Sequence, residues 1–387
     1  MSGSRRIVPN AVPHLAGNEW KYVKECLDTN WVSSAGPFVE RFEREVAAYV
    51  GVPHAVATVN GTAALHAALL AAGVEPGDEV LLPTLTFIAT ANAVSYCGAH
   101  PVLLDSEEVS WGLDPSRAAD FLAKECLVKS GRVVNRASGR VVRALLPVHL
   151  YGHPCDLDPL LELARRYPLA VVEDAAEALG ASYRGRRVGA DGLAGCLSFN
   201  GNKIITTGAG GMVLTRDDRL AARVRALTTQ ARGDALEFVH EEIGFNYRLS
   251  NLHAALGVAQ LEQLDHFVED KRLTAAFYQE TLGRMDGIRV FGETEWARST
   301  YWMPSVLFDE RRCPDLRALI RDLNGDGIQV RPLWRPIHLQ PAYRDAQADP
   351  APVAERLYAR GLSLPCSVGI MPDERRAVVD AIVSRLR

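Results

Sequence analysis

The chain of 387 residues lacks long apolar runs, closely spaced cysteine pairs and an excess of positive charge. No stretch approaches the ~20 consecutive apolar residues that a membrane-spanning helix needs. The net charge is -4, so no domain-wide basic surplus is present to neutralise nucleic-acid phosphates. The one basic cluster, at Lys129–Arg143, is expected to be a solvated loop. Neither a membrane nor a nucleic acid is therefore expected as a partner.

The seven cysteines are scattered and form no CxxC pair. An odd number of cysteines in a long chain indicates free thiols in a reducing compartment. The segment Met1–Arg6 leads to a proline instead of an apolar run, so no signal peptide is expected and the predicted location is cytoplasmic. His149, His153 and Cys155 lie close together in the sequence but lack a fourth ligand, and no metal site is predicted.

Short apolar strands alternate with helical stretches in the first half of the chain. The predicted strands include His54–Val59, Glu79–Pro83, Pro101–Asp105, Leu145–Leu150 and Ala170–Asp174. This alternation is typical of βαβ units and predicts an α/β fold with a mainly parallel sheet that is covered on both faces.

A different pattern follows in the last third of the chain. One long helical pattern runs from Leu252 to about Leu282, and a smaller α/β unit follows from Gly287. A chain of this length fits about two domains at ~150 residues each. We expect a large domain over residues 1–265 and a small C-terminal domain over residues 266–387.

Lys203 stands among small and polar residues in a glycine-rich stretch, with no carboxylate near it in the sequence. A partly desolvated lysine has a lowered pKa and a free lone pair, which makes it a candidate Schiff-base nucleophile. For an isolated lysine, an exposed loop position is the default interpretation. Two distant stretches change that balance.

The first stretch ends a predicted buried strand with Asp174, at the place where open α/β sheets bind ligands. A carboxylate there needs a cation, and a pyridinium nitrogen provides one. The alternative is a loop or helix-capping carboxylate. The second stretch, Asn60–Leu65, brings a Gly-Thr pair into a helix, and backbone N–H groups and a hydroxyl at a helix N-terminus suit a phosphate.

These stretches, taken in order with several others, resemble the DegT/DnrJ/EryC1/StrS family of sugar aminotransferases. The resemblance covers nearly the whole chain and rests on Gly36–Glu43, Asn60–Leu65, Thr84–Asn92, Val148–Gly152, Glu173–Gly180, Ser198–Lys203 and Gly244–Arg248. It implies fold type I of the pyridoxal 5'-phosphate (PLP) enzymes, with a large PLP-binding domain and a smaller C-terminal α/β domain. It also implies that Lys203 forms the Schiff-base link to PLP and moves the proton, and that Asp174 pairs with the pyridine nitrogen.

The resemblance implies further cofactor contacts. Phe87 is expected to stack on the ring, and Thr62, Ala63 and Ser198 to hold the phosphate. Asn246 is expected to reach that phosphate from a neighbouring subunit, which implies a homodimer. Glu177 takes the place near the phenolic oxygen where relatives often have Gln or His, and a charged carboxylate would repel a phenolate unless a proton is shared.

Two further stretches, Gly17–Leu27 and Arg331–Pro341, resemble the branch that aminates C4 of nucleotide-linked 4-keto-6-deoxy sugars, with L-glutamate as the expected amino donor. The candidate contacts to the sugar or diphosphate are Arg331, Trp334, Arg335 and His338. The alternative for this cluster is a loop packed between the domains.

Two alternatives to transamination stay open. One is a PLP-dependent sugar dehydratase of the same fold, but that related branch carries histidine where this chain has Lys203. The other is a non-catalytic PLP-binding regulator. A lysine near a former carbonyl carbon is well placed to supply its proton, which favours transamination.

Overall fold

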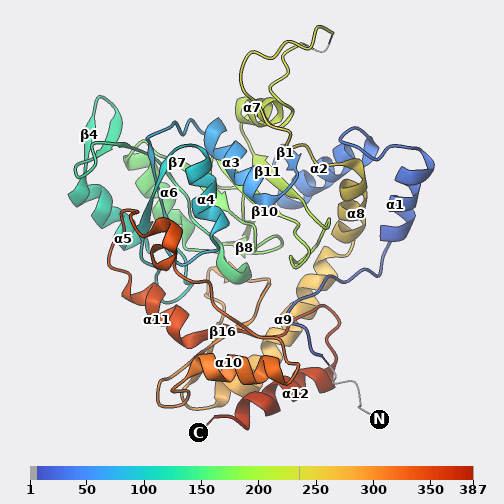
Figure 1. The fold of residues 1–387 in the computed structure, drawn as a ribbon, viewed down its shortest axis with the longest axis vertical. Coiled ribbons are helices and arrows are strands. Elements are labelled where there is room, and N and C mark those ends of the chain that lie inside the picture. Colours follow the sequence, from blue (N-terminus) through green and yellow to red (C-terminus); the bar gives the residue numbers. More distant parts are fainter. Residues whose placement is uncertain (1–6, 235, 387) are drawn as a thin grey trace.

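The computed structural model describes residues 7–234 and 236–386. The segment Met1–Arg6, on which the expectation of no signal peptide rests, lies outside the described residues. A nine-stranded sheet forms the centre of the molecule, with strands in the order β1-β11-β10-β7-β6-β2-β3 and with β5 and β4 added beside β6 (Figure 1). Its strands are β1 His54–Thr58, β2 Glu79–Pro83, β3 His100–Leu104, β4 Cys126–Lys129, β5 Arg132–Asn135, β6 Val141–Leu145, β7 Ala170–Asp174, β10 Ala194–Ser198 and β11 Gly211–Thr215.

Strand pairing runs parallel from β10 through β7, β6 and β2 to β3, whereas β11 is antiparallel to both β10 and β1. The expected α/β fold with a mainly parallel sheet is confirmed. Successive strand residues point to opposite faces, so Leu197 and Met212 enter one apolar cluster while Cys196 and Val213 enter the other. Burial on both faces explains why these strands are continuous apolar runs.

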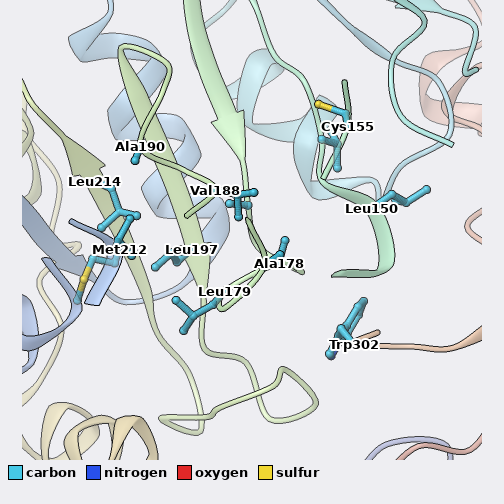
Figure 2. Close-up of a cluster of buried hydrophobic side chains, with 14 of the residues drawn as sticks. Leu150, Cys155, Ala178, Leu179, Val188, Ala190, Leu197, Met212, Leu214 and Trp302 are labelled. Atoms are coloured by element: carbon cyan, nitrogen blue, oxygen red, sulfur yellow. The ribbon is translucent and has the colours of Figure 1, made fainter. Parts of the chain in front are cut away.

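Helices cover both faces of this sheet (Figure 1). Helices α1 and α2 both pack on α8, and α3 packs on α4 and α7. The bounds are α1 Glu19–Asp28, α2 Pro37–Val50, α3 Gly61–Ala71, α4 Ala89–Tyr96, α5 Pro115–Asp120, α6 Leu157–Arg166, α7 Asp218–Thr228 and α8 Asn251–Leu261. Figure 2 shows part of one of the two clusters, in which Leu197 of β10 and Met212 and Leu214 of β11 gather with residues from connecting segments such as Leu179 and Val188.

A second, four-stranded sheet in the order β12-β14-β16-β15 lies towards the C-terminus. Its elements are β12 Ile288–Val290, β14 Ser305–Phe308, β15 Arg331–Pro332 and β16 Gly361–Ser363, with helices α9 Leu264–Thr281, α10 Leu316–Gly325, α11 Pro352–Arg360 and α12 Pro372–Val383. The small sheet has its own apolar cluster, which also includes Tyr278 and Leu282. The division of the chain at residue 265 stays a prediction. A three-stranded ribbon of β8 Ser182–Tyr183, β9 Arg186–Arg187 and β13 Ala297–Arg298 also forms.

Three local predictions were wrong. The pattern from Leu252 to Leu282 is two helices, α8 and α9, which are separated at residues 262–263. The basic cluster Lys129–Arg143 contributes to the hairpin β4–β5 and to β6, because Val133 and Val142 are buried and hold the segment to the sheet. The strand expected at Leu145–Leu150 ends at Leu145.

All seven cysteines are free and buried. Within residues 7–234 and 236–386, every helix is too short or too polar to cross a membrane.

Candidate active site

A cavity of about 370 Å³ opens where the central strands end. The carboxyl ends of parallel strands are the usual ligand-binding edge of an open α/β sheet. Most of the residues predicted for the site meet in this cavity, namely Thr62, Phe87, Asp174, Glu177, Ser198, Lys203, Arg331 and Trp334. Residues that are far apart in the sequence are therefore brought to one place.

Asp174 is the last residue of β7 and is buried. Its Oδ2 accepts a hydrogen bond from Thr90 Oγ1 at 2.8 Å, and its Oδ1 accepts one from the backbone N–H of Ala176 at 3.1 Å. Burial raises the pKa of Asp174, while the two hydrogen bonds and the charge of Lys203 oppose that shift. Thr90 is itself within 2.9 Å of Thr86 Oγ1. A short chain of hydroxyls thus orients the carboxylate.

Lys203 follows β10 and is largely buried, with its Nζ 3.6 Å from Oε1 of Glu177. Burial lowers the pKa of Lys203, while the carboxylates of Glu177 and Asp174 oppose that shift. A lysine of this kind exchanges a proton more readily than an exposed one. The indole ring of Trp302 also faces the amine, with 3.9 Å between Nζ and the ring centroid.

Glu177 is held from two sides. Its Oε2 accepts a hydrogen bond from the backbone N–H of Tyr151 at 2.8 Å, and its Oε1 accepts one from Nε1 of Trp334 at 3.1 Å. Burial raises the pKa of Glu177, and the charge of Lys203 counteracts part of that rise. A carboxyl group with a raised pKa holds a proton more easily, which eases the repulsion expected between Glu177 and a phenolate.

The N-terminus of α3 lines the cavity. Gly61 packs so close to the neighbouring strand that an added Cβ would lie 2.8 Å from Cβ of Ser198. This contact brings Ser198 next to Thr62, and both line the cavity. The backbone N–H of Ala63 donates instead to the capping Asn60 Oδ1 at 2.8 Å. The hydroxyls of Thr62 and Ser198 are therefore the available donors, whereas the amide of Ala63 is engaged.

Three of the four candidate sugar contacts line the cavity or the hollow beside it. Arg331 and Trp334 line the cavity, and Phe87 lies 5.1 Å from the Trp334 ring. Arg335 donates to the backbone oxygen of Leu339 and lines an adjoining hollow of about 310 Å³. Arg331 and Trp334 line both the cavity and this hollow, so the two spaces adjoin each other.

His338 does not line either hollow. Its Nδ1 lies 2.7 Å from Thr84 Oγ1, and its Nε2 lies 3.2 Å from Glu355. The reason is a backbone hydrogen bond from Ile337 to Thr84, which fixes the segment against the sheet. Asn246 is exposed and lies outside the cavity of its own chain.

The family model for the DegT/DnrJ/EryC1/StrS aminotransferases matches residues 13–383. The chain belongs to that family.

Relatives of known name agree with this assignment. The chain is 42% identical over 378 residues to GDP-perosamine synthase of Caulobacter vibrioides, and the match covers 97% of this chain and 96% of the relative. It is 38% identical over 351 residues to dTDP-3-amino-3,4,6-trideoxy-alpha-D-glucose transaminase of Streptomyces venezuelae, and this match covers 90% of the chain and 86% of the relative. The crystal structure of DesI in the presence of its TDP-sugar product matches with a TM-score of 0.87 at 31% identity, covering 98% and 93%.

Three residues of the site in this family member carry no clear local sequence signal. Thr90 lies within Thr84–Asn92, one of the stretches that carry the family resemblance, but no periodicity marks it as a partner of Asp174. Trp302 and Tyr151 come from loops whose position depends on the whole fold. Sequence patterns of period 2 or 3.6 do not report such contacts.

The residues considered for a metal have other partners. His149 Nε2 lies 2.9 Å from Glu173, and His149 Nδ1 accepts from the backbone N–H of Cys155 at 3.2 Å. His153 Nδ1 lies 2.7 Å from the oxygen of Pro154. In the part of the chain that the structure describes, no group of three or more His, Cys, Asp or Glu side chains is placed to hold a metal ion.

Proposed function

We propose that this aminotransferase moves an amino group from L-glutamate to C4 of a nucleotide-linked 4-keto-6-deoxyhexose, with PLP as cofactor. The observation that carries the proposal is the convergence of Lys203, Asp174 and Glu177 on one cavity in a chain 42% identical to a GDP-perosamine synthase. We also propose a cytoplasmic location, in keeping with the seven buried free thiols.

The donor set fits PLP. Thr62 and Ser198 offer hydroxyls at the N-terminus of α3 for a phosphate, where the helix dipole favours negative charge. Phe87 is 49% exposed on the cavity wall and offers an aromatic face. When bound, PLP supplies the electron sink for the bond changes at the amino-bearing carbon. Asp174 would hold the pyridine nitrogen, and Lys203 would hold the aldehyde carbon.

Lys203 is the acid and base in this proposal. Its lowered pKa allows it to take a proton from the carbon of glutamate that carries the amine. In the second half of the cycle it returns a proton to the former carbonyl carbon of the sugar. Asp174 stays ionised opposite a pyridinium, since the donated hydrogen bond of Thr90 stabilises the carboxylate.

Arg331, Trp334 and Arg335 border the route from the cavity to the adjoining hollow. We propose that they meet the sugar and the diphosphate, because arginine forks match phosphate oxygens. We propose that two copies of this chain form a homodimer, in which Asn246 of one subunit reaches the cofactor phosphate in the cavity of the other. The projecting segment around α7 supports this arrangement (Figure 1), since Leu236 and Ile243 are more than 80% exposed there.

The test is product analysis of the purified protein with L-glutamate and a 4-keto-6-deoxyhexose linked to GDP, and in parallel to UDP and dTDP. The proposal predicts an amino sugar nucleotide and 2-oxoglutarate in equal amounts. A dehydrated sugar formed without consumption of glutamate would instead support the dehydratase. Consumption of neither substrate by the PLP-loaded protein would support the non-catalytic regulator.

A further inference from the structure

The indole ring of Trp302 contacts the amine of Lys203. The Nζ atom lies 3.9 Å from the centroid of the ring, close enough for a cation–π interaction. Trp302 is 1% exposed and lines the cavity. In Figure 2 its ring lies on a segment of its own, apart from the strands that carry Leu197 and Met212. No local pattern in the sequence singles it out.

The position of this ring is fixed at several points. Its Nε1 donates to the backbone oxygen of Asn202 at 2.7 Å, so the ring is bound to the residue that precedes Lys203. Its backbone oxygen accepts from Lys271 Nζ at 3.1 Å and from Cys366 Sγ at 3.2 Å. The ring is thus held by its own N–H, and the backbone that carries it is held by two further donors, which is the fixed placement that a positioning residue requires.

Gly152 allows the segment of Trp302 to come this close. Its φ is +90°, and an added Cβ would lie 2.4 Å from Thr300 Oγ1 and 2.6 Å from the backbone nitrogen of Trp302. The oxygen of Gly152 accepts hydrogen bonds from the backbone of Thr300 and from Ser299 Oγ, both at 2.9 Å. The loop at Gly152 and the Trp302 segment are thus fitted to each other.

We propose that Trp302 is a positioning residue for Lys203. The face of the Trp302 ring holds the lysine amine in its charged form whenever that amine is not covalently linked. This inference rests on the proposed role of Lys203. A lysine that acts in turn as a covalent partner and as an acid spends part of each cycle with a free amine. The ring attracts the ammonium but cannot accept its proton, so the proton stays available to the substrate.

The charged groups that face Lys203 are the carboxyls of Glu177 and Asp174, and Arg331 lines the same cavity. Glu177 attracts the ammonium too, but it is also able to take the proton. Trp302 differs in this respect, because its ring does not titrate. The amine of Lys203 thus lies close to the Glu177 carboxylate, which competes for its proton, and to the Trp302 ring, which does not.

The test measures the pKa of Lys203 in the full-length protein freed of cofactor, from the pH dependence of its acetylation read by mass spectrometry. Trp302→Leu should lower that pKa by about one unit, and Trp302→Phe by less, because phenylalanine keeps a weaker aromatic face. The pH profile of kcat should move in the same direction.

A second series guards against loss of folding. Fluorinated tryptophans incorporated into the chain keep the shape and the N–H of the ring but weaken its attraction for cations. The pKa of Lys203 should fall stepwise with each fluorine. The same series in Trp302→Phe protein, in which the other five tryptophans are still fluorinated, should show no change in this pKa, and this control assigns the effect to Trp302. An unchanged pKa across the fluorinated series would overturn the inference.

This readout needs neither cofactor nor substrate. A pKa that responds to fluorination in a protein that transfers no amino group would leave the contact between Trp302 and Lys203 standing and would refute the proposed function instead.

Discussion

The Oε1 atom of Glu177 lies 3.6 Å from the Nζ atom of Lys203, although no carboxylate stands near Lys203 in the sequence. The contact joins the loop after β7 to the loop after β10, two neighbouring strands of the sheet. The same oxygen accepts the indole N–H of Trp334, a residue that follows β15 of the small sheet. Glu177 thus links the reactive amine to the wall of the candidate sugar pocket.

Replacing Glu177 by Gln should lower the pKa of Lys203, because the carboxylate stabilises the ammonium. More of the amine is then neutral at pH 7, and the protein freed of cofactor should regain PLP faster than the wild type at that pH. Stopped-flow absorbance measures the rate. Glu162→Gln, at an exposed position, is the matched control. An equal rate in all three proteins would show that Glu177 does not set the charge of Lys203.

Thr90→Val should weaken PLP binding by roughly ten- to a hundredfold, since a hydrogen bond to a buried charged group contributes ~1.5–3 kcal/mol. The variant removes the donor to Asp174 and keeps the size of the side chain. Equilibrium dialysis of PLP measures the change. Thr90→Ser keeps the hydroxyl and should bind nearly as well as the wild type. Equal weakening in both variants would point to packing instead of the hydrogen bond.

Trp334→Phe should raise the KM for the nucleotide sugar by a larger factor than it slows the half-reaction with L-glutamate. The variant keeps an aromatic ring beside Phe87 and Tyr151 but loses the N–H that binds Glu177. Separate kinetics of the two half-reactions provide the measurement. An effect confined to the glutamate half-reaction would remove Trp334 from the proposed sugar site.

Glu173→Gln should destabilise the fold by about 3 kcal/mol, because it breaks a fully buried charged network. Burial alone would raise the pKa of Glu173, but hydrogen bonds from His149 and from backbone N–H groups of Gly189 and Gly192 outweigh it and lower that pKa. Urea unfolding with the Glu162→Gln variant as control measures the difference.

The pH dependence of this effect follows from the direction of the shift. A carboxyl group whose pKa is lowered by folding stabilises the protein above its unfolded pKa, near 4.3, and this contribution is lost as the pH falls through the folded pKa. The difference between wild type and Glu173→Gln should therefore be full at pH 6 and shrink below about pH 4. A difference that grows on acidification would contradict the assignment of a charged Glu173.

The sequence predicted the sheet because its buried strands are apolar runs. It singled out Asp174 at the end of such a run, Thr62 at the start of a helix and Lys203 in a glycine-rich stretch. It placed the basic segment before Arg143 in a loop, since the charged residues obscured the alternation at Val133 and Val142. It also did not reveal Thr90 or Trp302 as parts of the site. Their roles depend on contacts between segments far apart in the chain, and local periodicity carries no information about those contacts.

His338 shows a related limit. A histidine in an arginine- and tryptophan-rich segment looked suited to a phosphate, but only tertiary structure reveals that Thr84 and Glu355 occupy both ring nitrogens. Arg331 and Trp334 come from the same segment and do line the cavity. The segment, which was chosen by its resemblance to a sugar-aminotransferase branch, does reach the cavity, but the direction of each side chain was not predictable from the sequence.

If Lys203 is the amino-transferring lysine of a PLP-dependent aminotransferase, the absorption spectrum of the purified protein should change when L-glutamate is added. The band of lysine-linked cofactor should give way to the band of its amine form, and Lys203→Ala should bind cofactor without ever showing the lysine-linked band. A wild-type spectrum that responds to neither glutamate nor any other amino acid, or a lysine-linked band that persists in Lys203→Ala, would contradict this role of Lys203.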